Sequence, residues 1–315
     1  MKYKAMGVGI LLSVTCVFFG LPRQKEFPAL EGPYLGQIPP GKTPELFAPG
    51  IISTCTQHSS VYFSRDGKEV YFSRMFPRPS VIMYMCERDG RWTAPQVVCE
   101  GLTPGLAPDG RTVYFSTWKL WRMFRTPEGW TEPELLPDHI NFQKRQDTPY
   151  AAADGALYFC SMFGNADGIY RSRLANNVYA QPERIEYGIS GNSANFSPYI
   201  APDESYMIFS STRPGYGISD LYISFHNKDG SWTKPKNMGP RINTSAKESF
   251  PFVSFDGKYL FFMSNRASEL NRRRVPDGPG NVYWIDAGFI KGMSPDEMKR
   301  ELSRSKGSSM LEWVE

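Results

Sequence analysis

Several kinds of chemistry are missing from this 315-residue sequence. Cysteine and histidine are scarce, at 5 and 3 residues. The cysteines form no CxxC pair and the histidines are scattered, so a zinc site has no support. No G-x-S-x-G nucleophile elbow, P-loop or G-x-G-x-x-G occurs. These absences argue against the common serine-hydrolase and nucleotide-dependent enzymes, and we expect neither a metal ion nor another cofactor.

Concentrated charge is also missing. The formal net charge is +4, of which Lys2 and Lys4 supply two units. The densest basic cluster, at 272–274 with Arg266 nearby, lies among Asn, Glu, Pro and Gly and is typical of a solvated loop. Nucleic-acid binding is therefore not expected, because it needs a basic face. A hydrophobic content of 41% and a charged content of 22% exclude disorder for the chain as a whole.

The N-terminal residues predict export. Lys2 and Lys4 precede an uncharged apolar stretch over residues 5–21, and charges return at Arg23. This pattern predicts a signal peptide or membrane anchor over residues 1–22. Cys16 raises a lipid anchor as an alternative, although residues 13–15 resemble a lipobox poorly. We expect a periplasmic or extracellular protein, with a membrane tether through the N-terminus as the open alternative.

The remaining cysteines are Cys55, Cys86, Cys99 and Cys160. An even number in an exported protein permits disulfides. Cys160 lies inside the apolar strand pattern ALYFCS, which is typical of a buried small side chain. The disulfide state of the four therefore stays open at this point.

One unit occurs five times. Copies such as VYFSRDGKEVYFSR at 61–74 and PFVSFDGKYLFFMSNR at 251–266 predict a strand, a tight Asp-Gly turn and a second strand. Because the fourth copy has Glu where the others have Gly, its turn is expected to differ. The copies align on five aspartates, and the steps between them are 43, 45, 49 and 53 residues. The aspartates are Asp66, Asp109, Asp154, Asp203 and Asp256.

A second half-unit follows each of the first four copies. It contains another short strand, a turn and a Trp-Thr-x-Pro segment, as at 92–95, 130–133 and 232–235, with a degraded version around Tyr179. Each repeat thus predicts four short strands, and four-stranded units repeated in a ring describe a β-propeller. The aspartates and the aromatic residues of this unit are expected to be structural.

The chain ends predict how the ring closes. The fifth copy gains a third strand at 281–289 but no Trp-Thr-x-Pro segment, whereas TPELFAPGI at 43–51 matches the outer segment at 131–136. We therefore predict an all-β fold of five blades, closed by an N-terminal strand donated to the last blade. Six blades are the alternative, but the residues for a sixth are missing.

The domain boundaries follow from this closure. A linker over 23–42 leads to the propeller at 43–290, and a tail with a short helix at 294–305 occupies 291–315. Ser294 is its expected N-cap, with Glu297 completing a capping box.

The repeats resemble the WD-repeat-like propeller family of bacterial exported proteins, the type found in the TolB propeller domain. The segments APDGRTVYFS at 107–116 and SFDGKYLFF at 254–262 carry the resemblance, which covers roughly residues 43–286. It implies a propeller and, as in TolB-like proteins, protein–protein contact at the cell envelope. Related repeats occur in lyases acting on pectic oligosaccharides and in propeller domains of prolyl-oligopeptidase-type proteases. The fold by itself does not determine function.

Candidate binding residues lie where the copies differ. In a propeller, the loops before the first strands and between the second and third strands emerge on one face, and loops on a rigid scaffold commonly carry binding residues. Arginine, carboxylate, histidine and tryptophan together suit an anionic or sugar-like ligand or a partner peptide; pairing among them is the structural alternative. The candidates are His58, Arg74, Trp118, Asp147, Asn195, Arg213, Glu248 and Arg266.

The sequence thus predicts an exported, non-enzymatic, monomeric propeller that binds a protein or glycan partner at the cell envelope through this face. The alternative is a carbohydrate-active enzyme, a lyase or hydrolase, using His58, Asp147 and Glu248 on the same face. No catalytic residue is assigned, because no third group is found to orient His58 as a base.

Overall fold

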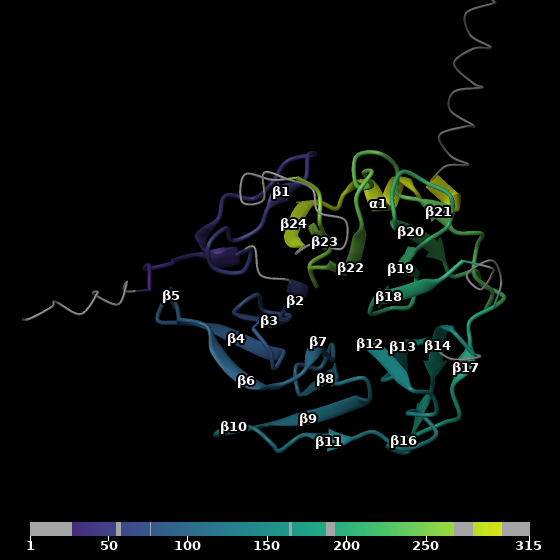
Figure 1. Ribbon diagram of the computed structural model, residues 1–315, viewed down its shortest axis with the longest axis horizontal. Helices are drawn as coiled ribbons and strands as arrows, with labels where there is room; N and C mark the ends of the chain where they lie inside the picture. The colour runs from purple at the N-terminus through teal and green to yellow at the C-terminus, as the bar shows by residue number, and fades with distance from the viewer. Residues whose placement is uncertain are drawn as a thin grey trace, which may run out of the picture.

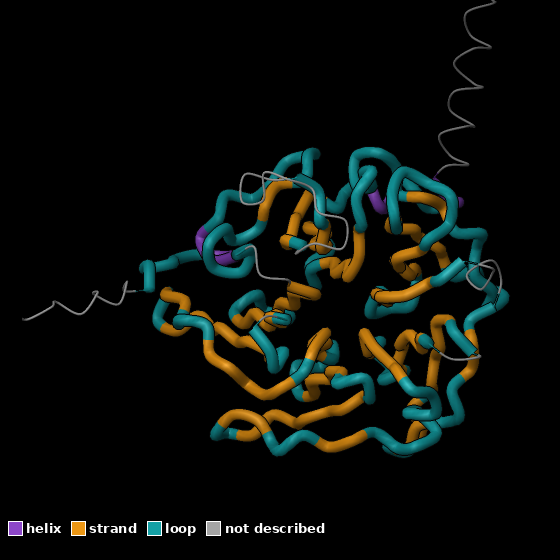
Figure 2. Tube along the Cα trace, in the orientation of Figure 1, coloured by secondary structure: helices purple, strands orange, loops and turns teal. Residues whose placement is uncertain are grey.

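The structure is a computed structural model that describes residues 27–54, 58–75, 77–163, 166–186, 193–267 and 280–297. Five antiparallel blades are arranged in a ring, and the chain runs around it from blade 1 at residue 58 to blade 5 near residue 286 (Figure 1). Strands and loops make up nearly all of the described chain (Figure 2). The five-bladed prediction is confirmed, and the six-bladed alternative is wrong.

In each blade the first strand lies innermost and the later strands follow outward. Blade 1 comprises β2 (His58–Phe63), β3 (Glu69–Arg74), β4 (Val81–Arg88), β5 (Arg91–Trp92) and β6 (Gln96–Glu100). Blade 2 comprises β7 (Leu102–Leu106), β8 (Thr112–Ser116), β9 (Leu120–Thr126), β10 (Gly129–Trp130) and β11 (Glu134–Leu135). Blade 3 comprises β12 (Arg145–Ala151), β13 (Leu157–Met162), β14 (Gly168–Ser172), β17 (Glu183–Arg184) and the small hairpin of β15 (Leu174–Ala175) with β16 (Val178–Tyr179).

The last two blades are simpler. Blade 4 comprises β18 (Asn195–Ile200), β19 (Tyr206–Ser211), β20 (Asp220–Phe225) and β21 (Lys236–Asn237). Blade 5 comprises β22 (Glu248–Val253), β23 (Tyr259–Ser264), β24 (Asn281–Asp286) and β1 (Glu45–Leu46). The short helices are η1 (Pro33–Gly36) and α1 (Phe289–Gly292).

The Asp-Gly turns behave as the repeat predicts, with one correction. Gly67, Gly110 and Gly257 have φ of 70–71°, in the left-handed region that glycine tolerates. The expectation that the fourth turn differs is wrong: Glu204 adopts the same conformation, with φ 57°. Its side chain accepts hydrogen bonds from the Tyr158 hydroxyl and the Arg171 guanidinium of blade 3, which offset the backbone strain.

The threonine of the Trp-Thr-x-Pro segment has a repeated structural role. In blades 1, 2 and 4 its hydroxyl accepts the backbone N–H of a third-strand residue, at 2.9–3.1 Å. The threonine N–H in turn donates to the carbonyl of the same third-strand residue. The segment is therefore the hairpin that connects the third strand to the outer strand. The threonines are Thr93, Thr131 and Thr233.

The ring closes by strand donation. β1 pairs with β24, placing Glu45 opposite Trp284 and Leu46 opposite Tyr283, and the Phe47 N–H donates to the Val282 carbonyl. Phe47 is fully buried, and its ring contacts Phe261 and Trp284 at centroid distances of 5.1 Å. The predicted closure is confirmed.

The segment expected as a linker also packs on the ring. The Tyr34 ring contacts Phe63 of blade 1 and Tyr259 of blade 5, at 5.1 and 5.0 Å. The Trp92 indole N–H donates to the Gly32 carbonyl at 2.8 Å. From residue 27 onward the N-terminal segment therefore joins the first and last blades, in addition to the strand it donates.

Aromatic rings fill the axis of the propeller. Equivalent positions of four innermost strands carry Tyr62, Tyr150, Tyr199 and Phe252, which are buried. Neighbouring rings in this set lie 4.4 to 6.1 Å apart. Burial raises the pKa of Tyr62 and Tyr199 well above the ordinary tyrosine value. These four residues form an aromatic floor that separates the two faces of the ring.

The fifth equivalent position is Gly105, where the backbone approaches blade 3 closely. A Cβ at this position would overlap the Pro149 carbonyl oxygen. We expect Gly105→Ala to lower the free energy of unfolding by about 1–3 kcal/mol, because backbone would have to move. Urea denaturation measures this change. Gly239→Ala is the comparison for backbone strain without a steric clash, because a Cβ at Gly239 meets no atom within 4 Å while the residue has a φ of 83°. Equal stability of Gly105→Ala and wild type would contradict the packing at this joint.

The C-terminal and cysteine expectations are tested in part. The Glu297 N–H donates to Ser294 Oγ at 3.3 Å, as the expected N-cap requires, and the predicted helix beyond residue 297 lies outside the described residues. Cys86, Cys99 and Cys160 are free thiols. Cys16 and Cys55 lie outside the described residues. Within the described chain, no helix is long and apolar enough to cross a membrane.

Candidate functional site

The site lies on the face that bears the loops between second and third strands, which we call the variable face. Every innermost strand has a bulge near this face, seen as a shift of register. The bulge places Thr103, Thr148, Ser197 and Phe250 in the left-handed region, with φ of 49–54°. Such conformations are costly for residues other than glycine, and they re-aim side chains.

An arginine between two exposed aromatic rings marks the variable face. The Arg145 guanidinium lies 5.8 Å from the Trp118 ring centroid and 5.4 Å from the Phe163 ring centroid. Trp118 is 58% exposed and Phe163 is 70% exposed. Both aromatic residues have left-handed backbones, with φ of 73° and 61°. We call Trp118, Arg145 and Phe163 the aromatic–arginine clamp.

The aspartate that anchors this clamp is itself enclosed. Asp147 is buried, and its Oδ2 accepts a hydrogen bond from Arg145 at 2.8 Å. Its Oδ1 accepts the hydroxyls of Thr103 and Ser116 of blade 2, at 2.8 and 2.6 Å. Asp147 therefore joins blades 2 and 3 and fixes the arginine. The predicted residues Trp118 and Asp147 belong to one site.

Phe163 occupies a position at which blades 4 and 5 carry an arginine that stacks on aromatic rings. The equivalent residues, two positions after the serine that ends the second-strand pattern in blades 4 and 5, are Arg213 and Arg266. These arginines stack on aromatic pairs of their own blades. In blade 3 the Phe142 ring covers the corresponding pair, 5.0 Å from Tyr170. Because Phe142 already covers these rings, the Phe163 side chain does not pack on them and is exposed to solvent.

A cavity of about 320 Å³ opens beside the clamp, and we call it the mouth cavity. Blades 3, 4 and 5 contribute its wall. The lining carries Arg145, Asp147, Asp167 and Lys247 as charged residues, with Thr148 and Ser197 as hydroxyl residues. The apolar lining residues are Met162, Phe163, Ala194, Phe196 and Phe250.

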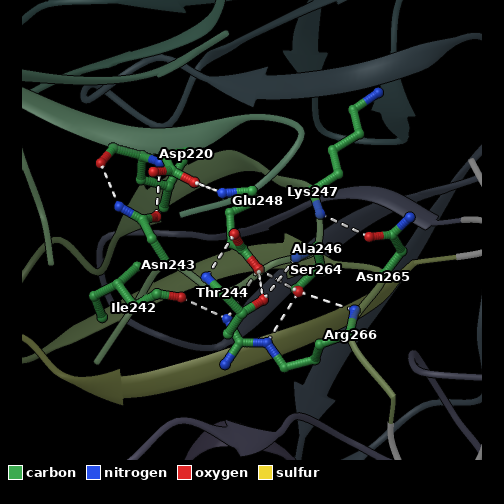
Figure 3. Close-up of polar contacts among 12 residues, drawn as sticks. Asp220, Ile242, Asn243, Thr244, Ala246, Lys247, Glu248, Ser264, Asn265 and Arg266 are labelled. Atoms are coloured by element: carbon green, nitrogen blue, oxygen red, sulfur yellow. Dashed lines mark hydrogen bonds and ion pairs between the residues drawn. The ribbon is translucent and has the colours of Figure 1, made fainter. Parts of the chain in front are cut away.

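Glu248 and Arg266 form a separate, closed cluster in blade 5 (Figure 3). Glu248 is fully buried, and it accepts hydrogen bonds from the Thr244 hydroxyl and Ser264 Oγ, each at 2.8 Å. Arg266 lies 3.2 Å from Glu248 and donates to the Ile242 carbonyl. Burial raises the pKa of Glu248 above its usual range, although its hydrogen bonds and Arg266 oppose this shift. Glu248 and Arg266 therefore pair with each other, which is the structural alternative to ligand binding that the sequence left open.

The other predicted residues are spread around the ring. The Arg213 guanidinium stacks on Phe209 and Tyr222 in blade 4, at 5.5 and 5.7 Å. Asn195 is buried at the start of β18 and donates to the Ser193 carbonyl. Arg74 ends β3 opposite His58, whose side chain lies outside the described part of the structure. The eight predicted residues therefore do not converge on one cluster.

The eight candidates include Trp118 and Asp147 but not the other residues of the clamp and the mouth cavity wall, namely Arg145, Phe163, Phe196, Lys247 and Phe250. A signal was available for two of them. Phe163 stands where two other copies have arginine, and Phe250 stands where the equivalent residues are Thr103, Thr148 and Ser197. A break in repeat chemistry at a surface loop was therefore more informative than charge. In the described chain, no group of three histidine, cysteine or acidic residues could hold a metal ion.

The comparisons with known proteins show the fold. No protein-family model and no curated protein sequence matches this chain. TolB from Acinetobacter baumannii is similar in structure, with a TM-score of 0.49 and 18% identity, over 74% of this chain and 57% of that one. This chain thus spans a little over half of that TolB.

Enzymes with similar structures are also found. The endo-arabinase from Bacteroides thetaiotaomicron has a TM-score of 0.50 and 13% identity, over 75% of this chain and 96% of that one. The α-L-arabinofuranosidase PaAbf62A from Podospora anserina, solved with cellotriose, has a TM-score of 0.46 and 13% identity, over 81% and 96%. At these identities the similarity establishes a propeller and leaves the function to the site itself.

Proposed function

We propose that this protein is an exported, non-enzymatic binding propeller, which recognises a protein or glycan partner at the cell envelope through its variable face. The observation that carries the proposal is the aromatic–arginine clamp. Two large rings are held in solvent by strained backbones, and the arginine between them is fixed by a buried aspartate. Strain of this kind is concentrated at functional sites. Aromatic residues and arginine are the side chains enriched at binding hot spots.

Catalysis by the predicted carboxylates has less support. Glycoside hydrolysis needs two carboxyl groups that reach the substrate from opposite sides. Glu248 is enclosed by Thr244, Ser264 and Arg266. Asp147 uses both oxygens within the protein. Both carboxylates already use their oxygens in hydrogen bonds within the protein, so these two groups give the enzyme alternative little support.

The proposed compartment rests on the sequence. The basic residues Lys2 and Lys4 followed by an uncharged apolar stretch are typical of exported chains. Fractionation of cells that express the full chain, followed by detection of the protein in periplasmic and membrane fractions, tests the compartment.

Removing the rings of the clamp should weaken binding without unfolding the protein. Because Trp118 and Phe163 are mostly exposed, Trp118→Ala with Phe163→Ala should change the free energy of unfolding by only about 0.5 kcal/mol. Binding should weaken at least tenfold, since exposed aromatic anchors contribute more than about 1.4 kcal/mol to hot spots. A photo-crosslinking residue with an aromatic side chain, placed at 118 so that a ring is kept there, identifies a protein or glycan captured on this face in cells that make the partner.

The matched control is on the opposite face. Lys68→Ala with Lys258→Ala alters the Asp-Gly turns of blades 1 and 5 and should leave binding unchanged. Capture by a crosslinker at position 258 and none at 118 would overturn the proposed binding face.

A further inference from the structure

The mouth cavity has an apolar wall that the repeat does not require. Phe250 is the bulge residue of blade 5, with φ 52°, and the equivalent bulge residues Thr103, Thr148 and Ser197 are small. Three blades therefore make the same bulge without a large side chain. A phenylalanine in the left-handed region carries a strain of about 1–2 kcal/mol, so its packing or its function must offset that strain. The Phe250 side chain lines the mouth cavity together with Phe163 and Phe196.

A cation that forms no ion pair with any described residue lies at the same cavity. Lys247 precedes Glu248, but that carboxylate is taken by Arg266. The Lys247 side chain points away from the Glu248 cluster (Figure 3), and its ammonium lies 5.7 Å from the Phe196 ring centroid. Among the ion pairs of the described residues, none includes Lys247. Three other charged residues line the cavity. Arg145 and Asp147 form an ion pair with each other, and the third is Asp167.

We propose that the mouth cavity receives one large apolar side chain of a protein partner, and that an aspartate or glutamate of the same partner segment contacts Lys247. The inference deepens the proposed function and rests on the variable face being the binding face. About 320 Å³ is near the lower end of the range for ligand pockets and is sufficient for one anchoring side chain. The anchor packs on Phe196 and Phe250, and the acid supplies charge complementarity at the rim.

A protein anchor fits this cavity better than a sugar does. A sugar ring brings several hydroxyls, and each buried hydroxyl left without a partner costs about 1–3 kcal/mol. Five of the eleven lining residues are apolar, and the buried hydroxyl of Thr148 already lies 3.8 Å from Cys160 Sγ. An acidic glycan would satisfy Lys247 but would leave its other hydroxyls against phenylalanine. Binding of such a glycan is therefore an outcome that the experiment must distinguish.

The test selects ligands without assuming a partner. A displayed library of random short peptides is panned against the immobilised full chain, and the enriched sequences are read out. The expected result is a motif with one large apolar residue next to aspartate or glutamate. A synthetic peptide with this motif should bind the protein, and added salt should weaken binding because the acid contact lies at a rim.

Two variants assign the motif to the cavity. Lys247→Glu should bind the synthetic peptide at least tenfold more weakly, and panning against this variant should enrich lysine or arginine beside the apolar residue. Phe250→Ser reproduces the small hydroxyl residue of blade 4 and should weaken binding about 30-fold, the size of a hot-spot loss. The matched control is Lys258→Glu on the opposite face, which should change neither the motif nor the affinity. Thermal melts of all three variants report whether they are folded.

The proposal is overturned if the enriched peptides lack an acidic residue, or if Lys247→Glu leaves their charge preference unchanged. It is also overturned if uronate-bearing oligosaccharides bind the wild type, lose affinity in Phe250→Ser and compete with no peptide. These failures differ from failure of the proposed function. In that case a crosslinker at position 118 captures nothing, whatever the peptide selection shows.

Discussion

A chain that begins at residue 54 should fail to form a stable closed ring. Such a chain loses the strand that pairs with β24, the fully buried Phe47 ring and the Tyr34 ring that joins blades 1 and 5. The lost strand exposes an edge of blade 5, which favours aggregation. We expect loss of the cooperative thermal transition and a high apparent mass in size-exclusion chromatography. A truncated chain that stays monomeric and melts like the wild type would contradict the closure.

A single substitution tests the same joint with less disturbance. Phe47→Ala removes a ring that contacts Phe63, Phe261 and Trp284, and it should lower the free energy of unfolding by about 3–5 kcal/mol. Ile38→Ala is the matched control within the same segment. Ile38 is 83% exposed, so its loss should change stability by about 0.5 kcal/mol or less.

Arg266→Ala should be nearly as destabilising, even though the residue lies at the variable face. Its removal leaves the fully buried Glu248 carboxylate without its cation, which typically costs about 3–5 kcal/mol. Arg266 also stacks on Phe262 and Tyr283, so packing is lost as well. Chemical denaturation measures the loss. Glu248→Gln in the Arg266→Ala background should recover part of it, because the uncharged amide needs no cation.

The pH dependence of this pair has a definite sign. Burial raises the pKa of Glu248 in the folded protein above its value in the unfolded chain. Its favourable contribution is therefore complete below the unfolded pKa and is lost as the pH rises through the folded pKa. Arg266→Ala raises that pKa further, so its destabilisation should be larger near neutral pH than at about pH 5. A loss of stability that is independent of pH would show that removing Arg266 leaves the pKa of Glu248 in the folded protein unchanged, and it would contradict this coupling.

The fold followed from the sequence because its repeat is both local and redundant. Each Asp-Gly copy specifies a hairpin through nearby residues, and the match between 43–51 and 131–136 was enough to identify the donated strand. The Glu204 turn was misjudged, since the bonds that stabilise it come from Tyr158 and Arg171 in the neighbouring blade. The sequence around the turn does not indicate such a partner, because both residues are distant in the chain.

The site was harder to predict, because side-chain direction depends on what fills the neighbouring space. Arg266 and Phe163 occupy equivalent positions. Arg266 lies against its own blade and pairs with the buried Glu248. In blade 3 the Phe142 ring packs at the corresponding place, and the Phe163 side chain is exposed. The arginines were chosen as ligand residues for their charge and for their place in the loops of this face. Charge shows that a group needs a partner, but only the packed structure shows whether the protein already supplies one.

The aromatic floor means that the ring is not a passage. Tyr62, Tyr150, Tyr199 and Phe252 meet across the axis, with neighbouring rings no more than 6.1 Å apart. A polymer that enters from the variable face can therefore be bound by its end or by a side group, but it cannot pass through the ring to the other face. Arrival and departure use the same opening. How long a bound partner stays is then governed by the contacts at that opening.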